Sequence, residues 1–318
     1  MNANATPVKA PLSERLLSPI LIKEMRSSMR GARFFVGITF FLLLIATVSL
    51  MVYYVQALDS YSNPTTIGRT LFGFMTAVES MLLMAIAPSL TAGAIAGERQ
   101  KQTFEMLMAT PLGVGQVLRG KLAASLNYLF LLLIAAIPIN SIVFLLGGIT
   151  PGSLIAWIIW LSVSVIMLAT FGLLVSSWMT RAGLATTLTY LLSALLFVVL
   201  PVMMLFIGTS FFFAAGNQPP CRSLASLGLL HPLAGFMAIN GVFSSNWTSY
   251  WPYLIAVLSF YIALSGLFYL ASRARLSSIL GVPNRRRWLI VVPLVVAIVA
   301  VVAIVTGPVE QLCNFPAP

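Results

Sequence analysis

The chain has 318 residues, of which 59% are hydrophobic and only 8% carry a charge, and its mean hydropathy is +1.00. The apolar share is far above that of an average soluble domain, which excludes an ordinary soluble globular protein. The formal net charge of +11 first reflects basic residues placed beside membrane segments, so it does not by itself indicate nucleic-acid binding, and we expect none.

The segment after the first twelve residues predicts an amphipathic helix that ends at about residue 33. At 100° per residue, its apolar face carries Leu17, Leu21, Met25 and Met29. Its opposite face carries four basic residues, which are Lys23, Arg26, Arg30 and Arg33. We expect residues 1–33 to form a cytoplasmic tail and a helix in the membrane plane, with the basic face on anionic lipid headgroups.

Long stretches without charge predict an all-α, polytopic membrane protein, because a spanning helix needs ~20 mostly apolar residues. We expect about seven transmembrane helices. They cover residues 34–55, 69–97, 121–146, 153–178, 184–208, 251–271 and 288–306. Gly- and Pro-containing residues 147–152 and the short stretch 178–183 predict tight turns between spans. The first six spans form a core at 34–271, and a basic loop at 272–287 leads to the extra span and tail at 288–318.

The positions of Lys and Arg predict the orientation, since basic loops remain in the cytoplasm. With the N-terminus inside and the C-terminus outside, 16 of the 18 basic residues are cytoplasmic, and only Arg69 and Arg222 are not. The apolar stretch 224–243 contains His231 and Pro232, and a full crossing there would move five arginines outside. We therefore expect short re-entrant or interfacial helices in an outer segment at 209–250, with a further span as the alternative.

Glu79 is the ionisable residue deepest inside a predicted span. A carboxylate within the membrane is a candidate functional group, so Glu79 is a candidate for the lining of a translocation path. The alternative, which we favour, is a protonated or hydrogen-bonded packing residue that faces Asn127 or Asn140 of the next span. At the end of the same span, Gly93 and Gly97 form a GxxxG pair, which predicts close helix packing.

The segment "GERQKQTFEMLMATPLG" at residues 97–113 concentrates charge between two apolar spans. It is followed by "GQVLRGKL" at 115–122, which matches the first part of the phosphate-binding pattern G-x-x-x-x-G-K. Leu122 then stands where a Ser or Thr must reach magnesium, and no strand precedes the motif. We therefore do not expect this chain to bind or hydrolyse ATP.

Catalytic and metal-binding residue types are scarce. His231 is the one histidine, and no cluster of His, Cys and carboxylates predicts a metal site. A membrane-embedded enzyme, such as a lipid-modifying transferase or a protease, would need polar groups that converge at one depth. The sequence offers only Glu79, His231 and scattered serines, so we expect the chain not to be an enzyme.

The two cysteines fall outside the membrane in this topology. Cys221 lies in the outer segment and Cys313 lies in the tail after the last span. Both face the oxidising side, where disulfides persist, and two cysteines allow one intrachain bridge. We predict this disulfide; the alternative is two unpaired thiols too far apart to meet.

The order of an in-plane basic helix, two spans, a charged segment and a third span resembles the permease subunits of type-2 ABC exporters. This class includes drug, sodium, polysaccharide and copper-enzyme-maturation systems. The matching inner-loop positions are Gly97, Glu98, Arg99, Thr103, Glu105, Leu107, Pro111, Gly120 and Lys121. "SPILIKEMR" at 18–26 is similar to the family's connecting helix, and the likeness covers about residues 13–271.

The resemblance implies a permease in the cytoplasmic membrane of a bacterium, paired with a second copy or a paralogue and docked on a separate ATPase. ATP and magnesium would then bind the partner, and this chain would hold no cofactor. The loop at 98–121 would couple the subunits. The residues expected to meet the ATPase are Glu98, Arg99, Lys101, Thr103, Phe104, Glu105 and Leu107. A non-transporting membrane anchor or sensor for a soluble ATPase is the alternative, and the seventh span departs from the family's six-span core.

Overall fold

A computed structural model describes residues 31–58, 63–104, 113–195, 199, 251–279 and 291–306. This part of the chain is almost entirely helical and contains no strand. Several predicted features lie outside the described residues, namely most of the in-plane helix, the outer segment at 209–250 and the predicted disulfide. The site residues concerned are Lys23, Arg26, Arg30, Glu105, Leu107, Cys221 and Cys313, and the side chain of Arg33 is likewise not described.

Five of the described helices are long and apolar enough to cross a membrane, which is the character of a multi-pass membrane protein. They are α3 (Ala32–Ala57), α4 (Pro64–Ala92), α7 (Val114–Ser141), α9 (Pro151–Trp178) and α14 (Trp251–Ile279). Four shorter helices accompany them, namely α5 (Ala96–Gln100), α8 (Val143–Leu146), α10 (Ala182–Ala194) and α15 (Val291–Thr306).

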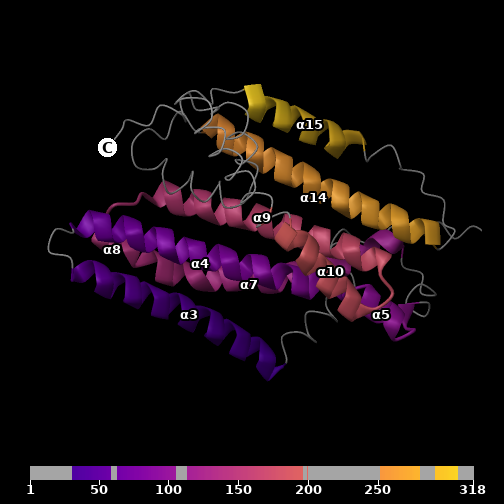
Figure 1. Cartoon of the computed structure of the whole chain (residues 1–318), viewed down its shortest axis with the longest axis horizontal. Coiled ribbons are helices and arrows are strands. Elements are labelled where there is room, and N and C mark those ends of the chain that lie inside the picture. Colours follow the sequence, from indigo (N-terminus) through magenta and orange to yellow (C-terminus); the bar gives the residue numbers. More distant parts are fainter. Residues whose placement is uncertain are drawn as a thin grey trace, which may run out of the picture.

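The long helices lie side by side, and α9 is at the centre of the bundle (Figure 1). Helix α9 packs against α4, α7, α10 and α14, whereas α3 covers α4 and α7, and α15 lies along α14. The large side chains of Trp157 and Trp160 on α9 are fully buried, together with Phe72 of α4 and Tyr261 of α14. The core of the bundle is therefore formed by α9 and the helices that surround it, and the outer helices α3 and α15 contribute less to it.

The second predicted span differs from the structure at both ends. Helix α4 begins at Pro64, before the predicted start at residue 69, because Pro suits the first helical position and Arg69 is exposed on the helix surface. It ends at Ala92, and Gly93 follows as its C-cap, so the predicted single span is interrupted before α5. The charged segment therefore starts on a separate short helix.

The predicted turns are confirmed. Helices α8 and α9 are joined across Gly147 and Gly148, whose φ angles of 75° and 89° favour glycine. Thr150 and Pro151 then begin α9, and the turn between Trp178 and Ala182 joins α9 to α10. Of the fifth predicted span, the structure describes the 13 residues of α10, and of the seventh it describes the 16 residues of α15.

Helix packing does not use the GxxxG pair in the predicted way. A Cβ atom added at Gly97 would have no described heavy atom within 4 Å, and one at Gly93 would lie 4.0 Å from Ala182 Cβ. The close approach is instead between α9 and α4, where a Cβ at Gly172 would overlap Thr91 Oγ1. Within the described part of the chain the pair does not lie on one helix face, because Gly93 ends α4 and Gly97 belongs to α5.

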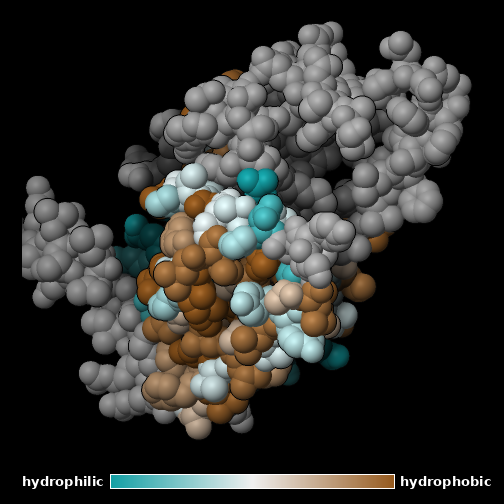
Figure 2. Space-filling model, turned by 90° about the vertical axis from the view of Figure 1, so that its left-hand side faces the viewer, coloured by the Kyte–Doolittle hydropathy of each residue, from teal (hydrophilic) through white to brown (hydrophobic). Residues whose placement is uncertain are grey.

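Large apolar side chains remain exposed on the outer helices. On α3 they include Phe35, Phe40 and Leu50, and on α15 they include Val291 and Val299. The end of the bundle that carries α8 is predominantly hydrophobic where it is described (Figure 2). Exposed apolar surface of this extent is what a lipid environment accommodates without cost.

Candidate functional site

The charged segment begins where α4 ends, and it is anchored there by a serine of another helix. Residues 93–95 turn the chain, and α5 then starts at Ala96. Ser176 Oγ, on α9, accepts hydrogen bonds from the backbone amides of both Ile95 and Ala96, each at 3.0 Å. Amides at the start of a helix have no acceptor within that helix, and a neighbouring N-cap side chain usually accepts from them. Here the acceptor is Ser176 Oγ, which belongs to another helix.

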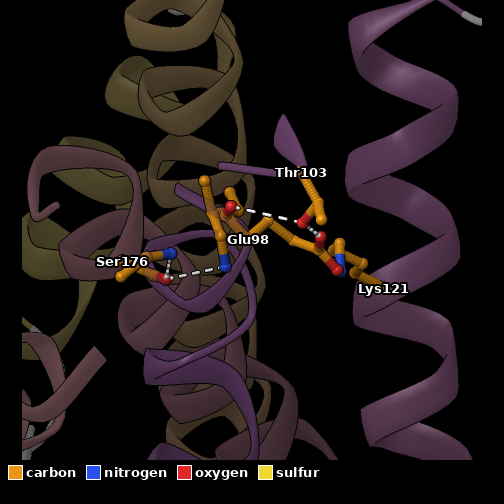
Figure 3. A network of polar contacts seen from close by, with 6 residues as sticks. Glu98, Thr103, Lys121 and Ser176 are labelled. Atoms are coloured by element: carbon orange, nitrogen blue, oxygen red, sulfur yellow. Dashed lines mark hydrogen bonds and ion pairs between the residues drawn. The ribbon is translucent and has the colours of Figure 1, made fainter. Parts of the chain in front are cut away.

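Glu98 connects α5 to α7. Its carboxylate oxygen Oε1 lies 3.1 Å from Lys121 Nζ, and its other oxygen accepts a hydrogen bond from the Thr103 hydroxyl (Figure 3). The Glu98 backbone carbonyl also accepts a hydrogen bond from the Thr103 amide at 3.0 Å. The Lys121 side chain is 9% exposed and that of Glu98 is 30% exposed. Because the ammonium is buried, its interaction with Glu98 is less screened than a surface ion pair.

Arg99 turns back toward the protein. Its guanidinium lies 5.2 Å from the centre of the Phe104 ring, and Nη1 donates to the Met179 carbonyl at 3.5 Å. Phe104 is itself buried in a small apolar cluster. This cluster joins five side chains from four parts of the bundle, namely Ile95, Phe104, Leu118, Leu173 and Leu276. The Arg99 guanidinium therefore lies over Phe104 at the edge of this apolar cluster.

Gln100 connects α5 to α10. Its Oε1 accepts a hydrogen bond from the backbone amide of Ala182, the first residue of α10, at 3.0 Å. The next residues, Lys101, Gln102 and Thr103, are all exposed, although the Thr103 hydroxyl bonds back to Glu98. Gln102 has a φ angle of 58°, so the chain reverses sharply there.

Basic residues collect at the end of the bundle that carries α5, which we call the basic end. Its members among the described residues are Arg99, Lys101, Arg119, Lys121, Arg181, Arg273 and Arg275. Arg275 lies over the Trp178 ring at 4.9 Å, which joins α14 to the end of α9. Arg69, near the start of α4, lies toward the opposite end. The contacts thus bring together basic residues that are separated by up to 176 positions in sequence (Arg99 to Arg275).

Glu79 lies in the interior of the bundle, with 2% of its surface exposed. Its Oε1 accepts a hydrogen bond from Asn140 Nδ2 at 2.6 Å, and its Oε2 accepts one from Trp157 Nε1 at 3.2 Å. Of the two asparagines considered above, Asn140 is therefore the partner. The three side chains belong to α4, α7 and α9, so the carboxylate connects three helices in the packed core.

The structure separates the site residues expected from the sequence into two groups. Glu98, Arg99 and Phe104 make contacts within the chain, and Lys101 is exposed; Thr103 is exposed but bonds to Glu98 through its hydroxyl and its amide. The sequence did not identify Ser176 and Gln100 as residues that fix the charged segment to the bundle. No local signal distinguishes Ser176 from the neighbouring serines of its apolar helix, and the role of Gln100 depends on the placement of α10.

The described side chains of this site offer hydrogen bonds and charges. Among the described residues, no group of three or more His, Cys, Asp or Glu side chains is close enough to hold a metal ion. The near-match to a phosphate-binding loop at 115–122 lies within helix α7, so its backbone amides follow a helix rather than a loop. No protein-family model matches the chain, and no curated protein matches it either.

Proposed function

We propose that this chain is the permease subunit of an ATP-binding-cassette exporter in a bacterial cytoplasmic membrane. A separate ATPase would dock at the basic end, and a second permease, identical or paralogous, would complete the membrane part. This proposal rests on the sequence resemblance and on one structural observation, the way in which α5 is bonded to the bundle. ATP and magnesium would bind the ATPase subunit.

The supporting observation is that α5 is tied to three other helices at once. Ser176 fixes its first amides to α9, Lys121 fixes Glu98 to α7, and Gln100 is fixed to the start of α10. A displacement of this segment would therefore be passed to several spans together instead of being absorbed at a hinge. Packed side chains, hydrogen bonds and ion pairs of this kind are one way in which coupling between distant sites is carried.

The exposed residues after α5 are the part that we propose as the ATPase contact. Lys101 and Gln102 are exposed directly beyond the bonded helix, and Thr103 is exposed as well while its hydroxyl bonds back to Glu98. When two ATPase subunits close over ATP, their movement would push this segment, and the two permeases would rock against each other. This is the alternating-access logic of transporters.

The proposal is tested by purifying the tagged full-length chain from its native membrane and identifying bound subunits by mass spectrometry. We expect an ATPase with nucleotide-binding motifs, in stoichiometric amount, whose hydrolysis rate responds to reconstitution with the chain. The Lys101→Glu variant should bind this ATPase several-fold more weakly, because the substitution reverses an exposed charge at the contact. Arg69→Glu makes the same charge change toward the opposite end of the bundle and should bind normally.

Each outcome separates the alternatives. Absence of any such ATPase would contradict the permease assignment. Equal binding by the Lys101→Glu and Arg69→Glu variants would contradict docking at this segment. Tight binding together with ATP hydrolysis that drives no transport in proteoliposomes would favour the membrane-anchor alternative.

A further inference from the structure

Two arginines and a tyrosine converge on one glycine at the basic end. Arg119 Nε donates a hydrogen bond to the Gly115 carbonyl at 3.1 Å, and the Tyr269 hydroxyl donates to the same oxygen at 3.2 Å. A Cβ atom added at Gly115 would lie 3.5 Å from Arg273 Nε and 3.6 Å from its Cζ. The groups come from α7 and α14, which touch each other here.

These guanidinium groups lack a counter-charge within the described residues. The described carboxylates are Glu79, which is bonded to Asn140 and Trp157, and Glu98, which is paired with Lys121. Arg119 donates its Nε hydrogen to the Gly115 carbonyl. In the described part of the chain, the terminal nitrogens of Arg119 and Arg273 have no hydrogen-bond partner. Two like charges held around one glycine repel each other unless an anion lies between or beside them.

The depth of this cluster matches the lipid headgroups. Arg119 lies five residues after the start of the apolar segment Val114–Leu146, and Arg273 lies six residues before the end of Leu254–Ile279. At a rise of 1.5 Å per residue, Arg119 lies about 7.5 Å and Arg273 about 9 Å from the respective helix end. The headgroup layer is about 5–8 Å thick on each side, and arginine side chains extend toward it.

We propose that Arg119, Arg273 and Tyr269 form a binding site for the phosphate of an anionic phospholipid, between α7 and α14. Arginine presents several donors in a fixed plane and suits phosphate oxygens, and the tyrosine hydroxyl, which bonds the Gly115 carbonyl, holds α14 against α7 beside them. Basic pockets between membrane helices on the cytoplasmic side bind such headgroups. The lipid would neutralise the paired arginines and hold the two helices together at the end where α5 lies.

The test uses the full-length chain purified in an uncharged detergent, without the ATPase. Binding of dioctanoylphosphatidylglycerol is titrated by native mass spectrometry, with dioctanoylphosphatidylcholine and inorganic phosphate as comparison ligands. We expect the Arg119→Gln and Arg273→Gln variants each to weaken binding of the anionic lipid about fivefold, and the double variant about 25-fold. Arg69→Gln removes the same charge toward the opposite end, and Arg181→Gln removes it at the start of α10, so both should bind normally.

Tyr269→Phe removes only the hydroxyl and provides a second test if an arginine variant does not fold; it should weaken binding by a smaller factor. Unchanged affinity in the double variant would overturn the proposal, as would equal affinity for the phosphatidylcholine. If inorganic phosphate binds as tightly as the anionic lipid, the site takes a free anion and the lipid assignment is wrong. If lipid binding is unchanged and the variants instead lose the ATPase in a separate co-purification from the native membrane, these arginines belong to the protein contact.

Discussion

Glu98 and Lys121 form an ion pair whose two members are unequally buried, and this decides which substitution is the more harmful. Lys121→Met removes the buried ammonium and leaves a carboxylate that water can reach, so we expect a loss of about 1 kcal/mol. Glu98→Ala removes the carboxylate beside a largely buried ammonium and also the acceptor of the Thr103 hydroxyl, so we expect a larger loss of about 2 kcal/mol. Thermal unfolding of the purified variants measures the difference. A larger loss in Lys121→Met would contradict this account.

Glu79 makes a different prediction, because its partners are neutral donors in the core. Glu79→Gln keeps one side-chain oxygen that can accept one of the two hydrogen bonds, so we expect a loss of about 1 kcal/mol. Glu79→Leu removes both acceptors, so Asn140 Nδ2 loses its described hydrogen-bond acceptor in the core and Trp157 Nε1 loses its bond to the carboxylate. A buried donor left without its acceptor costs about 1–3 kcal/mol, so we expect the loss in Glu79→Leu to exceed that in Glu79→Gln.

The same variants distinguish packing from a role in translocation. If Glu79 acts through helix packing, transport by Glu79→Gln should follow its small loss of stability. A variant with normal thermal stability and no transport would instead favour the path-lining alternative. The sequence identified Glu79 and proposed Asn140 as one of two partners, because an intramembrane carboxylate needs a polar neighbour. It did not identify Trp157, since the contact depends on how α9 is rotated against α4.

At the scale of elements, Ser176 determines whether α5 is fixed to α9. Ser176→Ala removes the acceptor of two backbone amides, and loss of a cap typically costs about 1–2 kcal/mol. We expect amide exchange at residues 95 and 96 to accelerate, as measured by mass spectrometry of peptides from this region. Ser177→Ala is a matched control, because Ser177 is also buried but bonds to the Leu174 carbonyl of its own helix. Equal acceleration in both variants would show that Ser176 does not anchor α5.

The boundaries of the elements were predictable where local chemistry sets them. The fourth predicted span, 153–178, differs little from α9, because Gly147, Gly148 and Pro151 stop one helix and start the next. The second span was predicted with less accuracy, because the break after Ala92 leaves apolar residues on both sides and hydropathy does not register it. The internal bonds of the charged segment could not be predicted either, since Ser176, Gln100 and Lys121 meet only after the bundle has formed.

At the scale of the whole molecule, the contacts give the predicted orientation a sharp test. The basic end carries Lys101, and Arg69 lies near the start of α4, toward the opposite end of the same helical unit. Because basic residues favour the cytoplasm, Lys101 should be cytoplasmic and Arg69 should be outside. Both are exposed, so a cysteine placed at either position should react readily if the reagent can reach it.

The experiment replaces Cys221 and Cys313 by serine and then introduces Arg69→Cys or Lys101→Cys. In intact cells, a maleimide that cannot cross the membrane should label the Arg69→Cys variant only. The Lys101→Cys variant should react only after the membrane is opened, which also verifies that its thiol is accessible. The reverse pattern would invert the topology and place the proposed docking segment where no cytoplasmic ATPase can reach it. If both variants are labelled in intact cells, residues 69 and 101 do not lie on opposite sides of the membrane, and the predicted topology is wrong.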